Sequence, residues 1–357
     1  MWRAFVIVVC LAGVCFAADD ENVVPEMELR DQIASHTRQL LRDRKFPELE
    51  ALAEDYRSNK TRLPSGFWKL ANFYAGLESP GQGASGANWE SHLRLLEEWQ
   101  SSSPQSPTPL TGLAAAYVAY AWQGRGTGYA RDVSEDGWRL FRERLGKAEE
   151  MIQKARTNSL YDPNLAVSEL TVAKGLNWST EKYERTFNEA VSKEPCYPYY
   201  YLARAGYLLP RWYGEPGDVE RFASQAIKLN EACEGKGIYS RIAVYLLSYK
   251  GRDEWFFDVY KLSWPKVQEG FRDLEQRYPH SDWNLNEYCL LACHAKDSKT
   301  ADELFKRIGD HWDTSVWQTE ATFHKWQQWA AHPTPIPDRH ADAISRWKQW
   351  LRDLMAW

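Results

Sequence analysis

Apolar side chains recur every three or four positions along most of the 357-residue chain, and this periodicity constrains the fold more than any other feature. Positions three and four apart share one face of an α-helix, whereas a half-buried β-strand needs strict alternation of apolar and polar residues. Runs of alternating Val, Ile and Thr bounded by turns, which are typical of strands, are absent from the sequence. The sequence therefore predicts an all-α protein.

The helical segments are organised as repeated hairpins. The clearest unit covers residues 282–315, where small residues such as Cys289 stand at the expected contact between two helices. Apolar residues spaced by four and three and followed five residues later by Pro mark a second helix at 267–279 and again at 183–195. A fainter copy covers residues 96–117. Hairpins of 34 residues with this pattern are typical of tetratricopeptide (TPR) repeats, so we predict a TPR-like stack.

The predicted stack is irregular. Two turns that join the first helix of a hairpin to its second are enlarged, at residues 123–134 and 210–218. Near the C-terminus, prolines at 333, 335 and 337 interrupt a helix, and a last amphipathic helix with Trp347 on its apolar face suits a terminal cap. We predict a signal peptide over residues 1–17, a disordered acidic N-terminus over 18–27, a TPR-like stack of degenerate helical hairpins (an α–α superhelix) over 28–316, and a Trp-rich helical cap over 317–357.

The N-terminus has the features of an export signal. Arg3 precedes an almost wholly apolar run at residues 4–16, and Ala17 is followed by an abruptly acidic stretch. The apolar run is too short to span a bilayer as a helix. We expect cleavage after Ala17 or Ala18, no integral membrane segment in the mature chain, and a periplasmic or extracellular location.

The overall composition argues against nucleic acid as a partner. The chain has 44 Lys and Arg against 49 Asp and Glu, a formal net charge of −5, and no basic run. Binding to phosphate backbones needs clustered cations. Eighteen Trp and nineteen Tyr are an unusually high number. Their rings can fill gaps between helix layers, and they can also stack on sugars or peptides, so both interpretations stay open.

The remaining motifs favour structural roles. A Gly-rich run at residues 124–128 follows an amphipathic helix instead of a strand, which suits a helix cap better than a phosphate cradle. Cys289, Cys293 and His294 approach the spacing of a haem or zinc site but lack an obvious further ligand, so we interpret the cysteines as core thiols. We expect no cofactor and no metal.

Two further cysteines stand at the ends of predicted second helices. Four cysteines follow the signal peptide and allow three pairings. Neighbouring turns of a stack lie close together, and exported proteins meet oxidising conditions. A disulfide between Cys196 and Cys233 is therefore possible.

The two enlarged turns resemble the signatures of a known family. The residues concerned are AWQGRGTGY at 121–129, with Gly137 and Trp138 beyond, and LLPRWYGEPGD at 208–218. In these segments the chain resembles a bacterial TPR-like family known only as a domain of unknown function, over about residues 40–315. The resemblance implies a helical-repeat fold and a bacterial source. It implies no activity and no catalytic residues.

We predict a binding or scaffolding protein that engages a protein or peptide partner through the concave face of the stack or through the two enlarged turns. Aromatic residues beside Arg are typical of binding hot spots, although the same side chains can instead pin long loops to the stack. The alternative is a polysaccharide-active enzyme on a closed α/α toroid. No catalytic residue is predicted.

We expect both turns on one edge of the stack, where they would form the walls of a shared pocket. The candidate binding residues are Trp122, Arg125, Tyr129, Arg131, Arg211, Trp212, Tyr213, Glu215 and Asp218.

Overall fold

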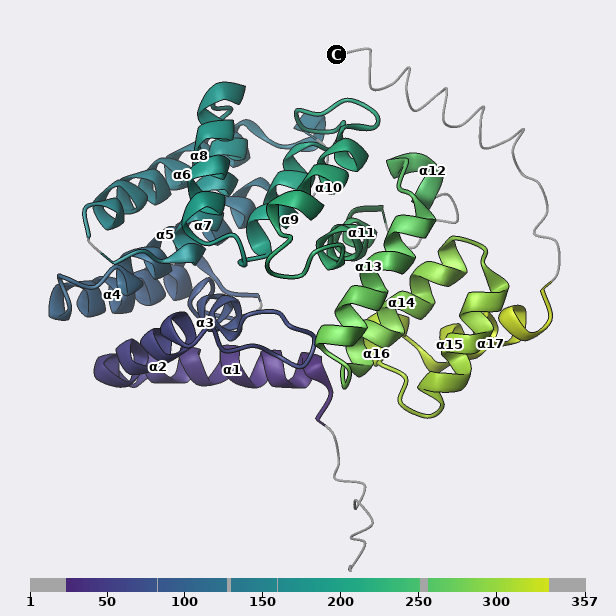
Figure 1. Ribbon diagram of the computed structural model, residues 1–357. Coiled ribbons are helices and arrows are strands. Elements are labelled where there is room, and N and C mark those ends of the chain that lie inside the picture. The colour runs from purple at the N-terminus through teal and green to yellow at the C-terminus, as the bar shows by residue number, and fades with distance from the viewer. Residues whose placement is uncertain (1–23, 82, 127–129, 159, 251–255, 334–357) are drawn as a thin grey trace, which may run out of the picture.

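The computed structural model describes residues 24–81, 83–126, 130–158, 160–250 and 256–333. Every regular element in these residues is a helix, and the only strand-like feature among them is an isolated bridge between Arg62 and Trp68 (Figure 1). The prediction of an all-α protein is confirmed, and the finer prediction of a TPR-like superhelix stays a prediction. The expected signal peptide, Trp347 and the prolines at 335 and 337 lie outside the described residues.

The helices follow one another as hairpins. The first hairpin consists of α1 (Glu26–Arg42) and α2 (Phe46–Ser58). Helix α1 thus begins two residues before the start expected for the helical domain. The other elements are α3 (Lys69–Leu77), α4 (Gly86–Ser102), α5 (Thr108–Arg125), the 3-10 helix η1 (Ala130–Asp132), α6 (Glu135–Arg156), α7 (Pro163–Gly175), α8 (Thr180–Lys193), α9 (Tyr199–Tyr207), α10 (Asp218–Leu229), α11 (Gly237–Lys250), α12 (Phe256–Tyr260), α13 (Trp264–Arg277), α14 (Asp282–His294), α15 (Ser298–Ile308), α16 (Thr314–Trp317) and α17 (Glu320–Ala331).

The hairpin of α14 and α15 shows how the sequence dictates these units. Ser281 caps α14 by accepting a hydrogen bond from the backbone N–H of Asn284, and Asp297 caps α15 in the same way. Cys289 on α14 and Ala301 on α15 are fully buried, and the Cys289 thiol lies 3.7 Å from the Ala301 carbonyl oxygen. Small residues at this position allow the two helices to approach closely. Both helices match the hairpin predicted over residues 282–315.

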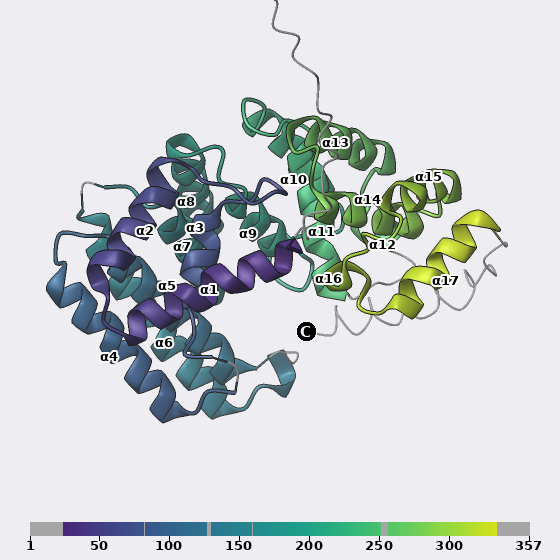
Figure 2. The same ribbon diagram turned by 90° about the horizontal axis from the view of Figure 1, so that it is seen from below.

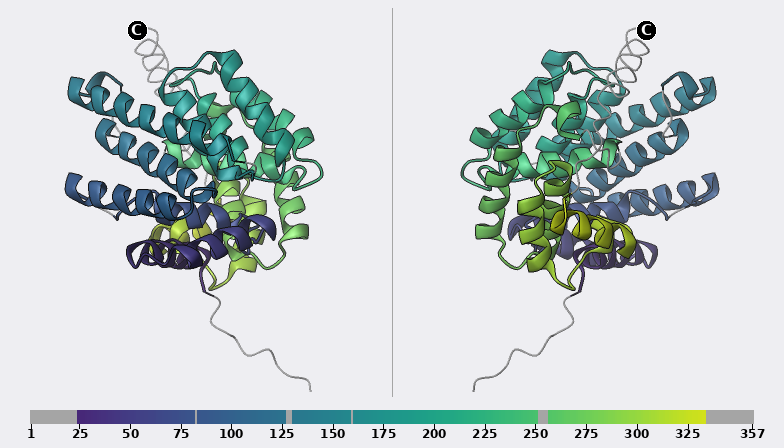
Figure 3. Two further views of the ribbon diagram at one scale, coloured as in Figure 1. Left: turned by 90° about the vertical axis from the view of Figure 1, so that its left-hand side faces the viewer. Right: turned by 90° about the vertical axis from the view of Figure 1, so that its right-hand side faces the viewer.

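The first helices of successive hairpins form a continuous inner layer. Helix α1 packs on α3, α3 on α5, α5 on α7, α7 on α9 and α9 on α11. The layer curves, so that the start of α1 lies beside α16 in the view from below (Figure 2). The two side views show that the helices of residues 86–156, coloured blue to teal, project to one side of the molecule (Figure 3).

The segment 59–68 between α2 and α3, here called the inner segment, joins the two ends of the array. The carbonyl oxygen of Ser65 accepts hydrogen bonds from Arg241 on α11 at 2.6 Å and from Asn284 on α14 at 3.1 Å. The ring of Phe67 lies 5.4 Å from Tyr199 on α9 and 5.9 Å from Trp283 on α14. Part of the inner surface that was expected to hold a partner is therefore covered by the chain itself.

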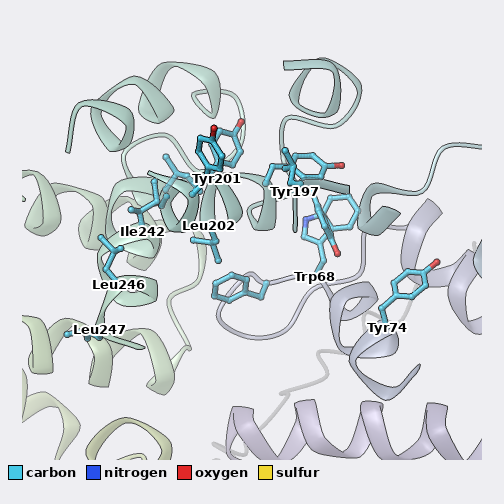
Figure 4. Packing of buried hydrophobic residues seen from close by; sticks show 14 of the residues in the cluster. Trp68, Tyr74, Tyr197, Tyr201, Leu202, Ile242, Leu246 and Leu247 are labelled. Atoms are coloured by element: carbon cyan, nitrogen blue, oxygen red, sulfur yellow. The ribbon is translucent and has the colours of Figure 1, made fainter. Parts of the chain in front are cut away.

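Aromatic residues pack around the C-terminal end of the inner segment. Trp68 packs edge-to-face on Tyr197, with ring centroids 5.2 Å apart, and its indole N–H donates to the Cys196 carbonyl oxygen (Figure 4). Both rings are almost completely buried, as are Tyr74 and Tyr201. Much of the high aromatic content is thus explained by packing between helix layers.

A buried ion pair links the first half of the array. Asp162 precedes α7 and accepts a hydrogen bond from Arg57 on α2 at 2.7 Å and another from the Tyr74 hydroxyl on α3. Arg57 also donates to the hydroxyl oxygen of Thr108 on α5 at 2.9 Å. One carboxylate therefore positions four helices.

The cysteines fall into two groups. Cys196 follows α8, Cys233 follows α10, and their sulfur atoms form a disulfide. Cys289 and Cys293 are buried as free thiols. Near the end of the described chain, α16 straddles the expected boundary between stack and cap at residues 316 and 317. None of the described helices has both the length and the apolar character needed to cross a bilayer.

Candidate functional site

The second enlarged turn packs against the end of α5, from which the first enlarged turn departs. The first covers residues 126–134 between α5 and α6, and the second covers 208–217 between α9 and α10, close to the predicted bounds. Trp122 in the last turn of α5 meets Trp212 edge-to-face, with ring centroids 5.7 Å apart. Trp212 of the second turn therefore lies against the helix that precedes the first turn.

Glycines allow each turn to adopt its conformation. Gly126 caps the C-terminal end of α5, and its φ of +76° is unfavourable for residues with a side chain. In the second turn a Cβ on Gly214 would lie 1.9 Å from the carbonyl oxygen of Leu208. The chain therefore folds back on itself directly after Trp212, and this holds the indole toward α5.

Cations and indole rings alternate where the second turn meets the end of α5. The Arg125 guanidinium lies 5.4 Å from the Trp122 ring, 5.1 Å from Trp138 and 5.7 Å from Trp212. From α7, the ammonium group of Lys174 lies 5.5 Å from Trp122 and 5.0 Å from Trp212. Such distances permit cation–π attraction. These five residues, Trp122, Arg125, Trp138, Lys174 and Trp212, are named the cation–indole cluster.

The electrostatics of the cluster favour an incoming anion. Burial and the charges of Arg211 and Arg125 lower the pKa of Lys174 to about 8. Burial and the charge of Arg211 also lower the pKa of Arg125. In both cases the neighbouring charges that shift the pKa are positive. The N–H group of Trp212 is buried and has no hydrogen-bond partner among the described residues.

Tyr213 holds the second turn against the stack. Its hydroxyl donates to the backbone carbonyl oxygen of Lys174 at 2.7 Å, and its ring stacks on Tyr207 at 4.6 Å. This side chain was predicted to line a binding site, and its contacts give it a structural role.

The predicted acidic residues shape the start of α10. Asp218 accepts a hydrogen bond from the backbone N–H of Glu215 at 2.6 Å and pairs with Arg221. Arg131 lies exposed in η1, 3.8 Å from Asp132. These contacts of Asp218, Glu215 and Arg131 involve no member of the cation–indole cluster, and Tyr129 lies outside the described residues.

Two members of the cluster were not among the predicted binding residues. Trp138 stands in the segment that resembles a family signature, so its residue type was a usable signal. Lys174 carried no such signal, because it belongs to the hairpin between the two turns and sequence spacing does not show which hairpins approach each other.

The cysteines of α14 have the properties of core thiols. Burial, followed by the neighbouring Cys293, raises the pKa of the Cys289 thiol well above its usual value. His294 is buried near Phe256 and Trp326, with ring centroids 6.0 Å and 6.2 Å away. Among the described residues no three His, Cys, Asp or Glu side chains gather closely enough to hold a metal ion.

Comparison with known proteins provides no relative from which a function can be transferred. No family model, no curated protein and no solved structure matches the chain. The functional argument therefore depends on the geometry and charge of the cation–indole cluster.

Proposed function

We propose that this is an exported binding protein without catalytic activity, which captures an acidic segment of a protein partner at the cation–indole cluster. Export is inferred from the N-terminal signal sequence. The binding role is inferred from the contact between the second enlarged turn and the end of α5.

The observation that carries the proposal is the buried, unpartnered N–H of Trp212 beside cationic side chains. A buried donor without an acceptor costs stability, so natural proteins rarely keep one unless a ligand, ion or water completes it. A carboxylate or a backbone carbonyl oxygen would accept from this N–H and would also face Arg125 and Lys174. A peptide segment rich in Asp or Glu offers both kinds of acceptor.

A structural explanation for the cluster is less complete. Tyr213 already attaches the second turn to α7 through its hydroxyl, and Asp218 already fixes the start of α10. Pinning the turns does not require additional cations near the same rings, since Arg125 and Arg211 repel Lys174 and lower its pKa. Positive charge gathered at a cost in stability is typical of a site built for a ligand.

The cluster gives the alternative of a polysaccharide-active enzyme little support. Hydrolysis of glycosidic bonds usually depends on a pair of carboxyl groups that face the substrate. The cluster brings together cations and indoles instead, and Asp218, the carboxylate used in the nearby turn, pairs with Arg221.

The test is fluorescence anisotropy with the full chain and a labelled peptide of alternating Glu and Leu. A peptide of alternating Lys and Leu with the same label serves as the comparison. We expect binding of the acidic peptide alone. Arg125→Gln should weaken binding about tenfold, since hydrogen bonds to charged groups are worth about 1.5–3 kcal/mol. Trp212→Phe, which keeps a ring but removes the N–H, should weaken binding less.

A second cation–aromatic pair provides the matched control. Lys182 lies 3.1 Å from the ring centroid of Trp178, in the same α7–α8 hairpin as Lys174 but outside the cluster. Lys182→Met should leave the affinity unchanged, whereas Lys174→Met should reduce it. Equal binding of both peptides, or melting temperatures that fall while affinity stays constant in the cluster variants, would show that the cluster only fastens the turns.

A further inference from the structure

A second candidate site lies on the inner face of the array, apart from the cation–indole cluster. A partly open cavity of about 630 Å³ is lined by the inner segment and by α1, α9, α11 and α14. Its volume falls in the range of about 300–1,000 Å³ that is usual for small-molecule sites. Figure 4 shows the surroundings, with Leu202 on α9 and Leu247 on α11, both of which line the cavity.

The walls are largely apolar. Phe67, Tyr199 and Trp283 contribute aromatic surface, and Leu202 and Leu247 contribute aliphatic surface. Apolar walls with a few converging polar groups are typical of sites for small organic ligands. The identity of the polar groups therefore decides which ligand would fit.

Arg241 is the principal polar group of the cavity. Its side chain is 1% exposed, lines the cavity and lies over the Phe67 ring at 4.3 Å. Its Nε and Nη2 atoms donate to Glu234, and Nη2 also donates to the Ser65 carbonyl oxygen. Its Nη1 atom is buried and has no hydrogen-bond partner among the described residues. A fully buried guanidinium with one unused edge is suited to receive an anionic oxygen.

The charges that face the cavity are predominantly positive. Arg30 lines it beside Arg241, with its guanidinium 5.0 Å from the rings of both Phe67 and Trp283. Glu287 is the one carboxylate among the lining residues. The carboxylates that pair with the two guanidinium groups, Glu26 and Glu234, are not part of the lining. A ligand inside would meet two cations and one anion.

The backbone beside the cavity is strained. Gln318, another lining residue, has φ +65° and ψ −47°, and a hydrogen bond from Thr319 N–H to the Trp317 carbonyl oxygen closes a three-residue turn around it. This turn geometry is rare for residues other than Gly. Strain of this kind is found mainly where the surrounding structure holds a residue for a ligand or a switch.

We propose that this cavity binds a small organic acid, with its carboxylate on Arg241 and Arg30 and its apolar body against the aromatic and leucine walls. The site is independent of the function proposed for the cation–indole cluster. Its ligand is a free carboxylic acid and not a protein segment, because the cavity has the volume of a small molecule.

Isothermal titration calorimetry of the full chain with decanoate and with decanol tests this assignment. The two probes share an alkyl chain and differ in charge. We expect decanoate to bind about tenfold or more tightly than decanol, because only the carboxylate uses the guanidinium groups. Arg30→Gln should remove most of this preference. Arg38→Gln, on the same helix but outside the lining, should not.

A second variant tests the location without altering charge. Val244 on α11 lines the cavity, and Val244→Phe should fill it and abolish decanoate binding. Val118→Phe, at a half-buried valine of α5 outside the lining, is the matched control and should bind decanoate normally. The assignment is wrong if decanoate does not bind, if decanol binds equally well, or if Val244→Phe still binds decanoate. Cation–indole variants should leave decanoate affinity unchanged, which separates this test from that of the peptide site.

Discussion

Asp162 connects several helices in the first half of the array, because α2 and α3 donate hydrogen bonds to it directly and α5 joins through Arg57. Removing one partner of a buried ion pair leaves the other charge without compensation. We expect Asp162→Ala to reduce the free energy of unfolding by about 3–5 kcal/mol. This change is measured by chemical denaturation, with unfolding monitored by circular dichroism.

Asp136 provides the comparison for this prediction. Its side chain is 83% exposed, and within the described part of the chain it pairs with Arg139 of the same helix alone. Asp136→Ala should change the free energy of unfolding by less than about 0.5 kcal/mol. A similar loss for both variants would mean that the Asp162–Arg57 pair does not position the helices.

The lowered pKa of Lys174 predicts how the free energy of unfolding depends on pH. Its pKa is lowered to about 8 in the folded protein, against an ordinary value of 10.5. Between these two values the unfolded chain binds more protons than the folded one, so the free energy of unfolding should rise as pH increases from 8 to 10. Lys174→Met removes this contribution. Denaturant titrations of both proteins should therefore show a steeper rise with pH for the unaltered chain, and parallel curves would contradict the lowered pKa.

At the scale of single residues, the sequence predicted some of the cluster but not all of it. Trp122, Arg125 and Trp212 were recognisable because aromatic residues and Arg are concentrated in turns too long for a simple hairpin. Lys174 was not recognisable from the sequence, because its contact with Trp212 joins two different hairpins. Tyrosine is common in binding sites, so the residue type of Tyr213 suggested a binding role. Its hydrogen bond to α7 shows the structural role.

At the scale of elements, the inner segment depends on one glycine. Gly66 has φ +94°, and a Cβ at this position would lie 2.3 Å from the Tyr278 ring and 2.8 Å from Nη2 of Arg241. Gly66→Ala should therefore strain the backbone and also push the segment away from α11. We expect a lower melting temperature, measured by calorimetry, and a loss of stability greater than the roughly 1–2 kcal/mol of the left-handed backbone alone.

Gly83→Ala is the control that measures the cost of the backbone conformation alone. Gly83 has φ +66°, and no atom lies within 4 Å of the position that its Cβ would take. Gly83→Ala should carry only the conformational cost. Equal effects of the two substitutions would indicate that the inner segment is loosely docked.

The helices themselves were largely predictable, and the inner segment was not. The α14–α15 hairpin is specified by small and apolar residues at helical spacing, which is local information. Residues 59–68 lack any such period, and their partners Arg241 and Asn284 are 176 and 219 residues from Ser65. Contacts across such separations leave no mark on local periodicity, so the covered inner surface and its cavity could not be expected from the sequence.

At the scale of the whole molecule, the inner segment changes how stability is distributed. In an open repeat array each unit contacts only its neighbours, and distant units can open independently. Here Ser65 and Phe67 connect the first hairpin to α14 directly. Opening the C-terminal hairpins should therefore expose the N-terminal hairpin as well.

Hydrogen exchange followed by mass spectrometry tests this coupling. Trp283 on α14 contacts Phe67 and Arg30, so Trp283→Ala should increase exchange in α1 and α3 as well as in α14. Trp312 is also half-buried, but it packs on Phe323 of α17 at the end of the array, 5.9 Å away. Trp312→Ala should increase exchange in α15 and α17 only. If Trp283→Ala leaves α1 and α3 as protected as before, the two ends of the array open independently and the closure is not energetically coupled.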